Sequence, residues 1–305
     1  MSSCEKTLYI NVTNECNLRC PHCFKTDYSN SLVKFDLVEA TLHCFNEIKN
    51  VVLFGGEFLL PKNTDYVLKI IDFIHSKNIF CSGTTNLFYK TLNEKQIEIL
   101  KKMDNVSTSW NPERFDTPEH LQWWLDNLDS IDRKKLCILI TLTKDLLKFP
   151  ARTIYEMFKD KAETIKFEPY IGEGESRPNN ADVDNWLTQF YNFVLKREND
   201  TVFEPFNSIE FGFRNGVSTS TFTRQCHKNT LSLNLSGETF TFCPNSQDIS
   251  RLEFQKKLFN FNERCFPCKF FKFCKGNCPL LTFDETGCSG YPKLFAKIQE
   301  NLNGY

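Results

Sequence analysis

The sequence has no excess of either charge and no long apolar run. Its 37 basic and 38 acidic residues give a net charge of −1, so no overall basic field favours a nucleic-acid partner. No stretch is apolar for long enough to form a signal peptide or a membrane-spanning helix. We therefore expect a cytoplasmic protein that does not bind membranes. The nearly neutral charge also makes RNA an unfavoured substrate.

A disulfide framework is the next feature that we expect to be missing. In a reducing compartment, clustered cysteines indicate metal ligands rather than disulfides. Ten of the fourteen cysteines fall into two groups, which are Cys16, Cys20 and Cys23, and Cys226, Cys243, Cys265, Cys268, Cys274, Cys278 and Cys288. The other four are scattered, and three of these lie in apolar surroundings that suggest inert, buried thiols.

The first two thirds of the chain alternates strand and helix patterns. Strands are indicated at 8–12, 51–54, 79–86, 106–110, 136–142 and 165–171, with five amphipathic helical patterns between them. Such alternation is typical of parallel βαβ units. Six units predict an α/β fold, a partial (β/α)6 TIM-like barrel, better than the eight-fold barrel. We expect this barrel at 1–200 and a small Cys-rich domain at 201–305, in which 231–242 forms a β-hairpin.

The loop after the first strand carries three thiols at C-x3-C-x2-C spacing. Three thiolates on a four-iron cluster leave one iron open, whereas a structural zinc takes four protein ligands. The spacing resembles the C-x3-C-x-Φ-C signature of radical S-adenosylmethionine (SAM) enzymes, where Φ is aromatic and His22 takes its place here. A zinc knuckle that uses His22 or a distant ligand is the alternative.

Two strand ends extend this resemblance. Gly55-Gly56-Glu57 follows the second strand, at the edge where parallel barrels form active sites, and its glycines let backbone approach a ligand. The segment resembles the GGE motif that holds the methionine amine of SAM in this family. Ser109 and Asn111 end the fourth strand and resemble the S-x-D-G segment near the ribose and carboxylate of SAM. A turn capped by Asn111 is the alternative there.

The C-terminal cysteines resemble the SPASM extension of radical SAM peptide and protein maturases. The resemblance implies an outer cluster on Cys265, Cys268, Cys274 and Cys288, and an inner cluster on Cys226, Cys243 and Cys278. The stretch 217–224 offers the inner cluster no further cysteine. Without the N-terminal motif, a zinc ribbon would be the first interpretation of this segment.

The family resemblance implies a reaction and its cofactors. These are SAM and three [4Fe-4S] clusters, with the cluster on Cys16, Cys20 and Cys23 cleaving SAM to a 5′-deoxyadenosyl radical that takes a hydrogen atom from the substrate. We expect oxidative modification of a peptide or protein side chain, first of all a cross-link or thioether on a ribosomally made peptide. Oxidation of a serine or cysteine in a folded protein and peptide epimerisation are alternatives. An iron–sulfur electron carrier or redox sensor is the alternative from another class, which Gly55-Gly56-Glu57 disfavours.

The implied partners follow from this chemistry. An external electron donor, similar to flavodoxin or ferredoxin, would reduce the SAM cluster. Fewer than ten residues precede the first predicted strand, so we expect any leader peptide to be bound elsewhere or by a separate protein.

Overall fold

The computed structural model describes residues 5–23, 25, 27–171, 174–196, 200–218, 229–240 and 251–304. Cys226 and Cys243, two of the predicted metal ligands, lie outside these ranges. Contacts divide the chain into two compact units, 1–139 with 227–244, and 140–226 with 245–305. The start of a Cys-rich domain near residue 200 stays a prediction.

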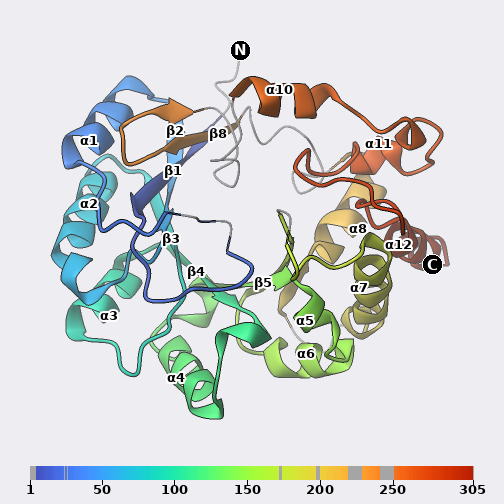
Figure 1. The fold of residues 1–305 in the computed structure, drawn as a ribbon, viewed down its shortest axis with the longest axis horizontal. Helices are drawn as coiled ribbons and strands as arrows, with labels where there is room; N and C mark the ends of the chain where they lie inside the picture. The colour runs from blue at the N-terminus through green and yellow to red at the C-terminus, as the bar shows by residue number, and fades with distance from the viewer. Residues whose placement is uncertain are drawn as a thin grey trace. The chain divides into compact units, whose positions relative to one another are not determined.

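Unit 1 is built on parallel strands in the order β4-β3-β2-β1-β8, and β9 runs antiparallel beside β8. The strands are β1 (Lys6–Thr13), β2 (Ile48–Gly55), β3 (Phe80–Thr85), β4 (Asn105–Trp110), β8 (Thr230–Leu233) and β9 (Thr239–Phe240). The connecting helices are α1 (Phe35–Cys44), α2 (Thr64–Ser76) and α3 (Glu94–Lys102), and α4 (Pro118–Leu128) follows β4. The first three lie along the same side of the strands (Figure 1).

Burial explains why β1 is central to unit 1. Leu8, Ile10 and Val12 are fully buried, as expected for a parallel strand with neighbours on both sides. One neighbour is β2, and the other is β8, which pairs Leu231 with Leu8. The predicted hairpin at 231–242 is confirmed by the pairing of β8 with β9. Its parallel pairing with β1 was not predicted.

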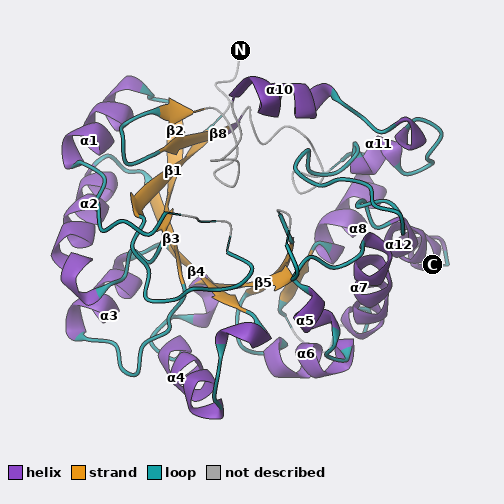
Figure 2. Ribbon diagram, viewed as in Figure 1, coloured by secondary structure: helices purple, strands orange, loops and turns teal. Residues whose placement is uncertain are grey.

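Unit 2 contains the remaining helices and a parallel pair of strands, β6 (Thr164–Pro169) and β7 (Val202–Glu204). Strand β5 (Leu136–Leu142) crosses the boundary between the units along the chain. The helices, purple in Figure 2, are α5 (Lys144–Leu147), α6 (Ala151–Phe158), α7 (Asn180–Val194), α8 (Phe206–Asn215), α10 (Arg251–Phe259), α11 (Phe271–Cys274) and α12 (Pro292–Asn303). None of the helices in the described ranges combines the length and apolar character needed to span a bilayer.

Aromatic rings fill the core of unit 2. The ring of Phe190 on α7 lies 4.7 Å from Phe167 on β6 and 5.6 Å from Phe206 on α8. Packing in this core therefore accounts for several of the 30 phenylalanines of the chain.

The direction of the strands positions the candidate site in unit 1. Strands β1 to β4 are parallel, so their carboxyl ends meet at one edge. The cysteine loop, Gly55, Asn86 and Asn111 follow these four ends in turn. This is the edge at which parallel α/β folds gather catalytic side chains.

Candidate active site

The loop after β1 carries the first three cysteines. Cys16 and Cys20 are half-buried and Cys23 is exposed, and none of them forms a disulfide. Burial is the main reason that the pKa of Cys16 is raised to about 11, and the nearby Cys20 and Cys23 thiols raise it further. Backbone N–H groups face two sulfurs, since Leu18 donates to Cys16 Sγ at 3.4 Å and Lys25 to Cys23 Sγ at 3.5 Å. The three thiols therefore share one polar environment.

His22, at the aromatic position of the motif, contacts the segment that follows β4. Its Nδ1 lies 2.8 Å from Oε1 of Glu113, and the two side chains are only 6% and 8% exposed. The next residue, Arg114, donates from Nη1 to the Ser109 carbonyl at 2.7 Å. Burial raises the pKa of the Cys20 thiol, and the adjacent Arg114 guanidinium opposes this effect. The short helix η2 (Pro112–Arg114) thus contacts the cysteine loop at two points.

The two glycines after β2 allow a close approach of backbones. A Cβ on Gly56 would come within 2.1 Å of the Glu15 carbonyl oxygen, and a Cβ on Gly55, whose φ is +145°, within 2.3 Å of that of Thr13. The N–H groups of Gly56 and Glu57 donate to the carbonyls of Thr13 and Glu15, both at 2.7 Å. The predicted glycine segment therefore joins the end of β2 directly to the start of the cysteine loop.

The Glu57 side chain is fully buried. Its Oε1 accepts from the Leu59 N–H at 3.0 Å and the Thr85 hydroxyl at 2.7 Å, and its Oε2 accepts from the Asn86 N–H at 2.6 Å. Burial raises the pKa of Glu57 to about 6, and the hydrogen bonds partly oppose it. The structure thus places this carboxylate inside the protein, where it accepts hydrogen bonds from residues that follow β2 and from the end of β3.

Ser109 and Asn111 lie at the end of β4, on the same edge of the sheet as the cysteine loop. Ser109 is half-buried and Asn111 is fully buried. Asn111 is the N-cap residue of η2, but its side chain accepts no capping hydrogen bond there. The alternative prediction of a turn capped by the Asn111 side chain is therefore wrong.

Sequence reasoning missed two polar residues of this edge. Lys25 is buried, and its Nζ donates to Asn14 Oδ1 at 2.7 Å and to the Thr13 carbonyl at 3.3 Å. Burial lowers the pKa of Lys25 to about 8. Asn86 is the second residue. It directly follows β3, and because the carboxyl ends of parallel strands converge, this position could have indicated a place in the site. Nothing in the sequence distinguishes Lys25 from an exposed loop lysine.

The C-terminal cysteines within the described ranges belong to unit 2: Cys265, Cys268, Cys274, Cys278 and Cys288. Burial is the main cause of the raised pKa values of Cys274 and Cys288. Neighbouring thiols add to the effect, from Cys288 and Cys265 on Cys274, and from Cys265 and Cys268 on Cys288. A Cβ on Gly290 would lie 2.7 Å from Cys274 Sγ and 3.3 Å from Cys288 Sγ. The structure thus brings together the four cysteines that were predicted for the outer cluster.

Comparison with known proteins identifies the N-terminal part of the chain. Residues 10–132 match the family described as the radical SAM superfamily. This part of the chain is a radical SAM domain. The fold of the chain resembles native anSMEcpe with bound AdoMet and Cp18Cys peptide, at a TM-score of 0.74 and 18% identity over 98% of this chain and 96% of that one. It also resembles Streptococcus suis SuiB bound to precursor peptide SuiA, at a TM-score of 0.63 and 15% identity over 93% and 76% of the two chains.

A curated relative matches over a shorter length. The chain is 33% identical over 107 residues to an uncharacterized protein of Methanocaldococcus jannaschii, a match that spans 32% of this chain and 36% of that protein. The fold matches confirm the predicted fold class, a partial α/β barrel with a Cys-rich C-terminal region.

The residues of the radical SAM site fit an iron–sulfur cluster. Three thiols, with N–H donors directed at two of their sulfurs, are a donor set suited to cluster ligation, because hydrogen bonds to sulfur stabilise such clusters. Within the described part of the chain, no three His, Cys, Asp or Glu side chains form a site for a single metal ion. The glycines at the end of β2 bring its backbone against Thr13 and Glu15, just before the first thiol.

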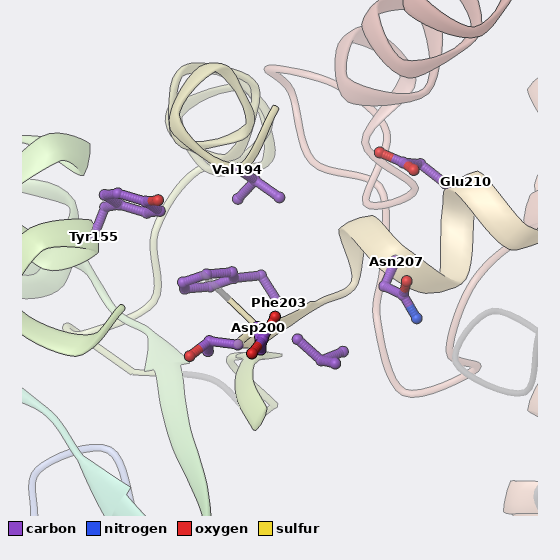
Figure 3. Close-up of a pocket in the computed structure, with 8 residues that line it drawn as sticks. Tyr155, Val194, Asp200, Phe203, Asn207 and Glu210 are labelled. Atoms are coloured by element: carbon purple, nitrogen blue, oxygen red, sulfur yellow. The ribbon is translucent and has the colours of Figure 1, made fainter. Parts of the chain in front are cut away.

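A separate cavity of about 190 Å³ lies in unit 2, lined by residues that include Tyr155, Asp200 and Glu210 (Figure 3). Glu210 accepts a hydrogen bond from the Tyr191 hydroxyl at 2.8 Å. No cysteine and no predicted SAM ligand lines this cavity, so it is distinct from the radical SAM site.

Proposed function

We propose that this radical SAM enzyme oxidatively modifies a side chain of a peptide or protein, by forming a cross-link or thioether on a ribosomally made peptide. The observation that carries the proposal is that the cysteine loop, the glycine segment, Asn86 and Asn111 all lie at the carboxyl edge of the parallel strands β1 to β4. An electron carrier needs no such edge. The peptides in the anSMEcpe and SuiB structures support a peptide substrate.

Three [4Fe-4S] clusters belong to this proposal. Cys16, Cys20 and Cys23 would hold the SAM cluster. The second group would hold the outer cluster on Cys265, Cys268, Cys274 and Cys288, and the inner cluster on Cys226, Cys243 and Cys278. When bound, SAM and the first cluster supply a 5′-deoxyadenosyl radical that takes a hydrogen atom from the substrate.

The chain's own residues hold and orient these groups. Backbone at Gly55 and Gly56 packs directly against Thr13 and Glu15, and so fixes the start of the cysteine loop at the end of β2. His22 braces the loop against Glu113, while Ser109 and Asn111 are the candidates at the nucleoside side. A protein similar to flavodoxin or ferredoxin would deliver the electron.

Metal content and SAM cleavage test the proposal. After anaerobic reconstitution we expect about twelve irons and twelve sulfides per chain, if every cluster contains four irons. Dithionite and SAM should then yield 5′-deoxyadenosine. Stoichiometric zinc with little iron in protein purified without oxygen would overturn the proposal.

The product separates the possible reactions. Incubation with a Cys-containing peptide encoded beside the enzyme should give a product that has lost two hydrogens and resists fragmentation between two joined residues. An aldehyde trapped by a hydrazine would instead indicate serine or cysteine oxidation. An inverted residue at unchanged mass would indicate epimerisation.

A further inference from the structure

Asn86 connects the buried Glu57 carboxylate to a predicted cluster ligand. Its backbone N–H donates to Glu57 Oε2 at 2.6 Å, and only 7% of the residue is exposed. The side-chain Nδ2 lies 3.6 Å from Cys16 Sγ and 2.8 Å from Asn17 Oδ1. Asn86 therefore contacts both the fully buried Glu57 carboxylate and the Cys16 thiol.

The orientation of the Asn86 amide follows from its other partner. Its Oδ1 accepts from the Phe88 N–H at 2.8 Å, and a backbone N–H can only donate. The Nδ2 group must therefore face Cys16 and Asn17. The Asn17 side chain agrees, because its own Nδ2 donates to the Phe88 carbonyl at 2.8 Å, which leaves its Oδ1 to accept from Asn86.

Both hydrogens of the Asn86 amide are thus used. One bonds to the oxygen of Asn17, and the other is directed at the sulfur of Cys16, which also accepts from the Leu18 N–H at 3.4 Å. An N–H directed at a cluster thiolate stabilises the added negative charge of the reduced cluster, and so raises its reduction potential.

We propose that Asn86 is a positioning residue that sets the reduction potential of the cluster on Cys16, Cys20 and Cys23. Its backbone is held by Glu57 and its amide orientation by Phe88. The proposal rests on the proposed function, because it requires that cluster. The electron enters singly from dithionite or a reduced flavodoxin-like protein and is retained by the cluster, without proton transfer by Asn86.

The test is an EPR redox titration of the reconstituted full chain, with the SAM cluster identified by the change that SAM causes in its signal. Asn86→Ser and Asn86→Asp both keep an oxygen that can accept from the Phe88 N–H, and both remove the amide donor. We expect a more negative midpoint potential in both variants, with the larger shift in Asn86→Asp because it adds negative charge. Both should retain wild-type iron content.

Asn17→Ala is the matched control, because it removes a partner of Asn86 but leaves the N–H directed at Cys16. It should keep the wild-type potential. Unchanged potentials in both Asn86 variants, or an equal shift in Asn17→Ala, would overturn the inference. Loss of iron from both Asn86 variants would show an assembly role and overturn it as well. A wild-type protein without a cluster or SAM cleavage would instead overturn the proposed function.

Discussion

The two cysteine groups are held in different ways. Around the N-terminal loop, the contacts come from strand ends far along the chain, such as Asn86 and η2. The C-terminal group is supported by local turns and aromatic packing. Phe273 beside Cys274 lies 4.5 Å from Phe213 on α8, and Phe270 lies 5.6 Å from Phe295 on α12.

The surroundings of the two cysteine groups suit different requirements. The first loop needs polar groups in fixed positions, because it must bind a charged cofactor and accept electrons. The second group also has an N–H donor to sulfur, from Gly290 to Cys288 Sγ at 3.2 Å, and burial raises the pKa of Cys274 to about 12. It differs from the first in the aromatic rings that pack around it. Substitutions in the two regions should therefore differ in their effects on SAM cleavage, iron content and the free energy of unfolding.

Removing the cysteines should have the largest effect. The triple change of Cys16, Cys20 and Cys23 to Ala should abolish 5′-deoxyadenosine formation and remove about four of about twelve irons. Changing Cys265 and Cys268 to Ala should remove a similar amount of iron but leave SAM cleavage. Iron analysis and chromatography of the products measure both. Formation of 5′-deoxyadenosine by the triple variant would contradict the assignment.

A carboxylate serves each region, and the buried one should matter more. Glu57→Ala leaves three buried donors without their acceptor, which should lower the free energy of unfolding by about 3 kcal/mol. Asp284 accepts from the Thr286, Gly287 and Asn180 N–H groups but is only half-buried, so water can replace it. We expect Asp284→Ala to cost about 1 kcal/mol. Urea unfolding curves compare the two, and equal costs would contradict the difference in burial.

The two glycines that border the cysteine groups offer a matched pair. A methyl on Gly56 meets the backbone of Glu15 at 2.1 Å, whereas one on Gly290 meets the Cys274 side chain at 2.7 Å. Gly56→Ala should therefore destabilise the protein by about 3 kcal/mol, and Gly290→Ala by about 1 kcal/mol, because a side chain moves more readily than backbone. Thermal unfolding and iron content measure both variants. A larger cost for Gly290→Ala would reverse the comparison.

The smallest effect concerns a helix start in unit 2. Asp184 on α7 accepts from the Lys293 and Leu294 N–H groups, both at 2.9 Å, and so caps α12, which has no side-chain cap from its own N-cap residue. Asp184→Ala should cost about 1 kcal/mol. Asp182→Ala, in the first turn of the same helix, is the comparison variant and should lower the urea midpoint less, because among the described residues Asp182 accepts only from the Asn179 side chain at 3.3 Å. Equal shifts in both variants would contradict the capping role.

The sequence predicted the elements and the chemistry better than the contacts between them. The six strands at 8–12 to 165–171 were found because buried apolar runs show in the sequence. The partner of 230–233 was missed, because alternation shows which face a strand presents but not which strand lies beside it. The resemblance of Gly55-Gly56-Glu57 to the GGE motif did not predict that the Glu57 side chain is fully buried. The direction of that side chain depends on neighbours such as Thr85 and Asn86.

The pairing of β8 with β1 has a consequence for synthesis. Thr7 pairs with Thr230 and Ile10 with Leu233, so the strand before the cysteine loop gains its second neighbour only after more than two thirds of the chain has been made. Long-range pairings of this kind form late, because closing a long loop costs entropy before the contacts repay it. In a nascent chain that ends before β8, the strand that leads into the cysteine loop is therefore an edge strand. We expect the proposed cluster on this loop to be inserted after β8 has been translated.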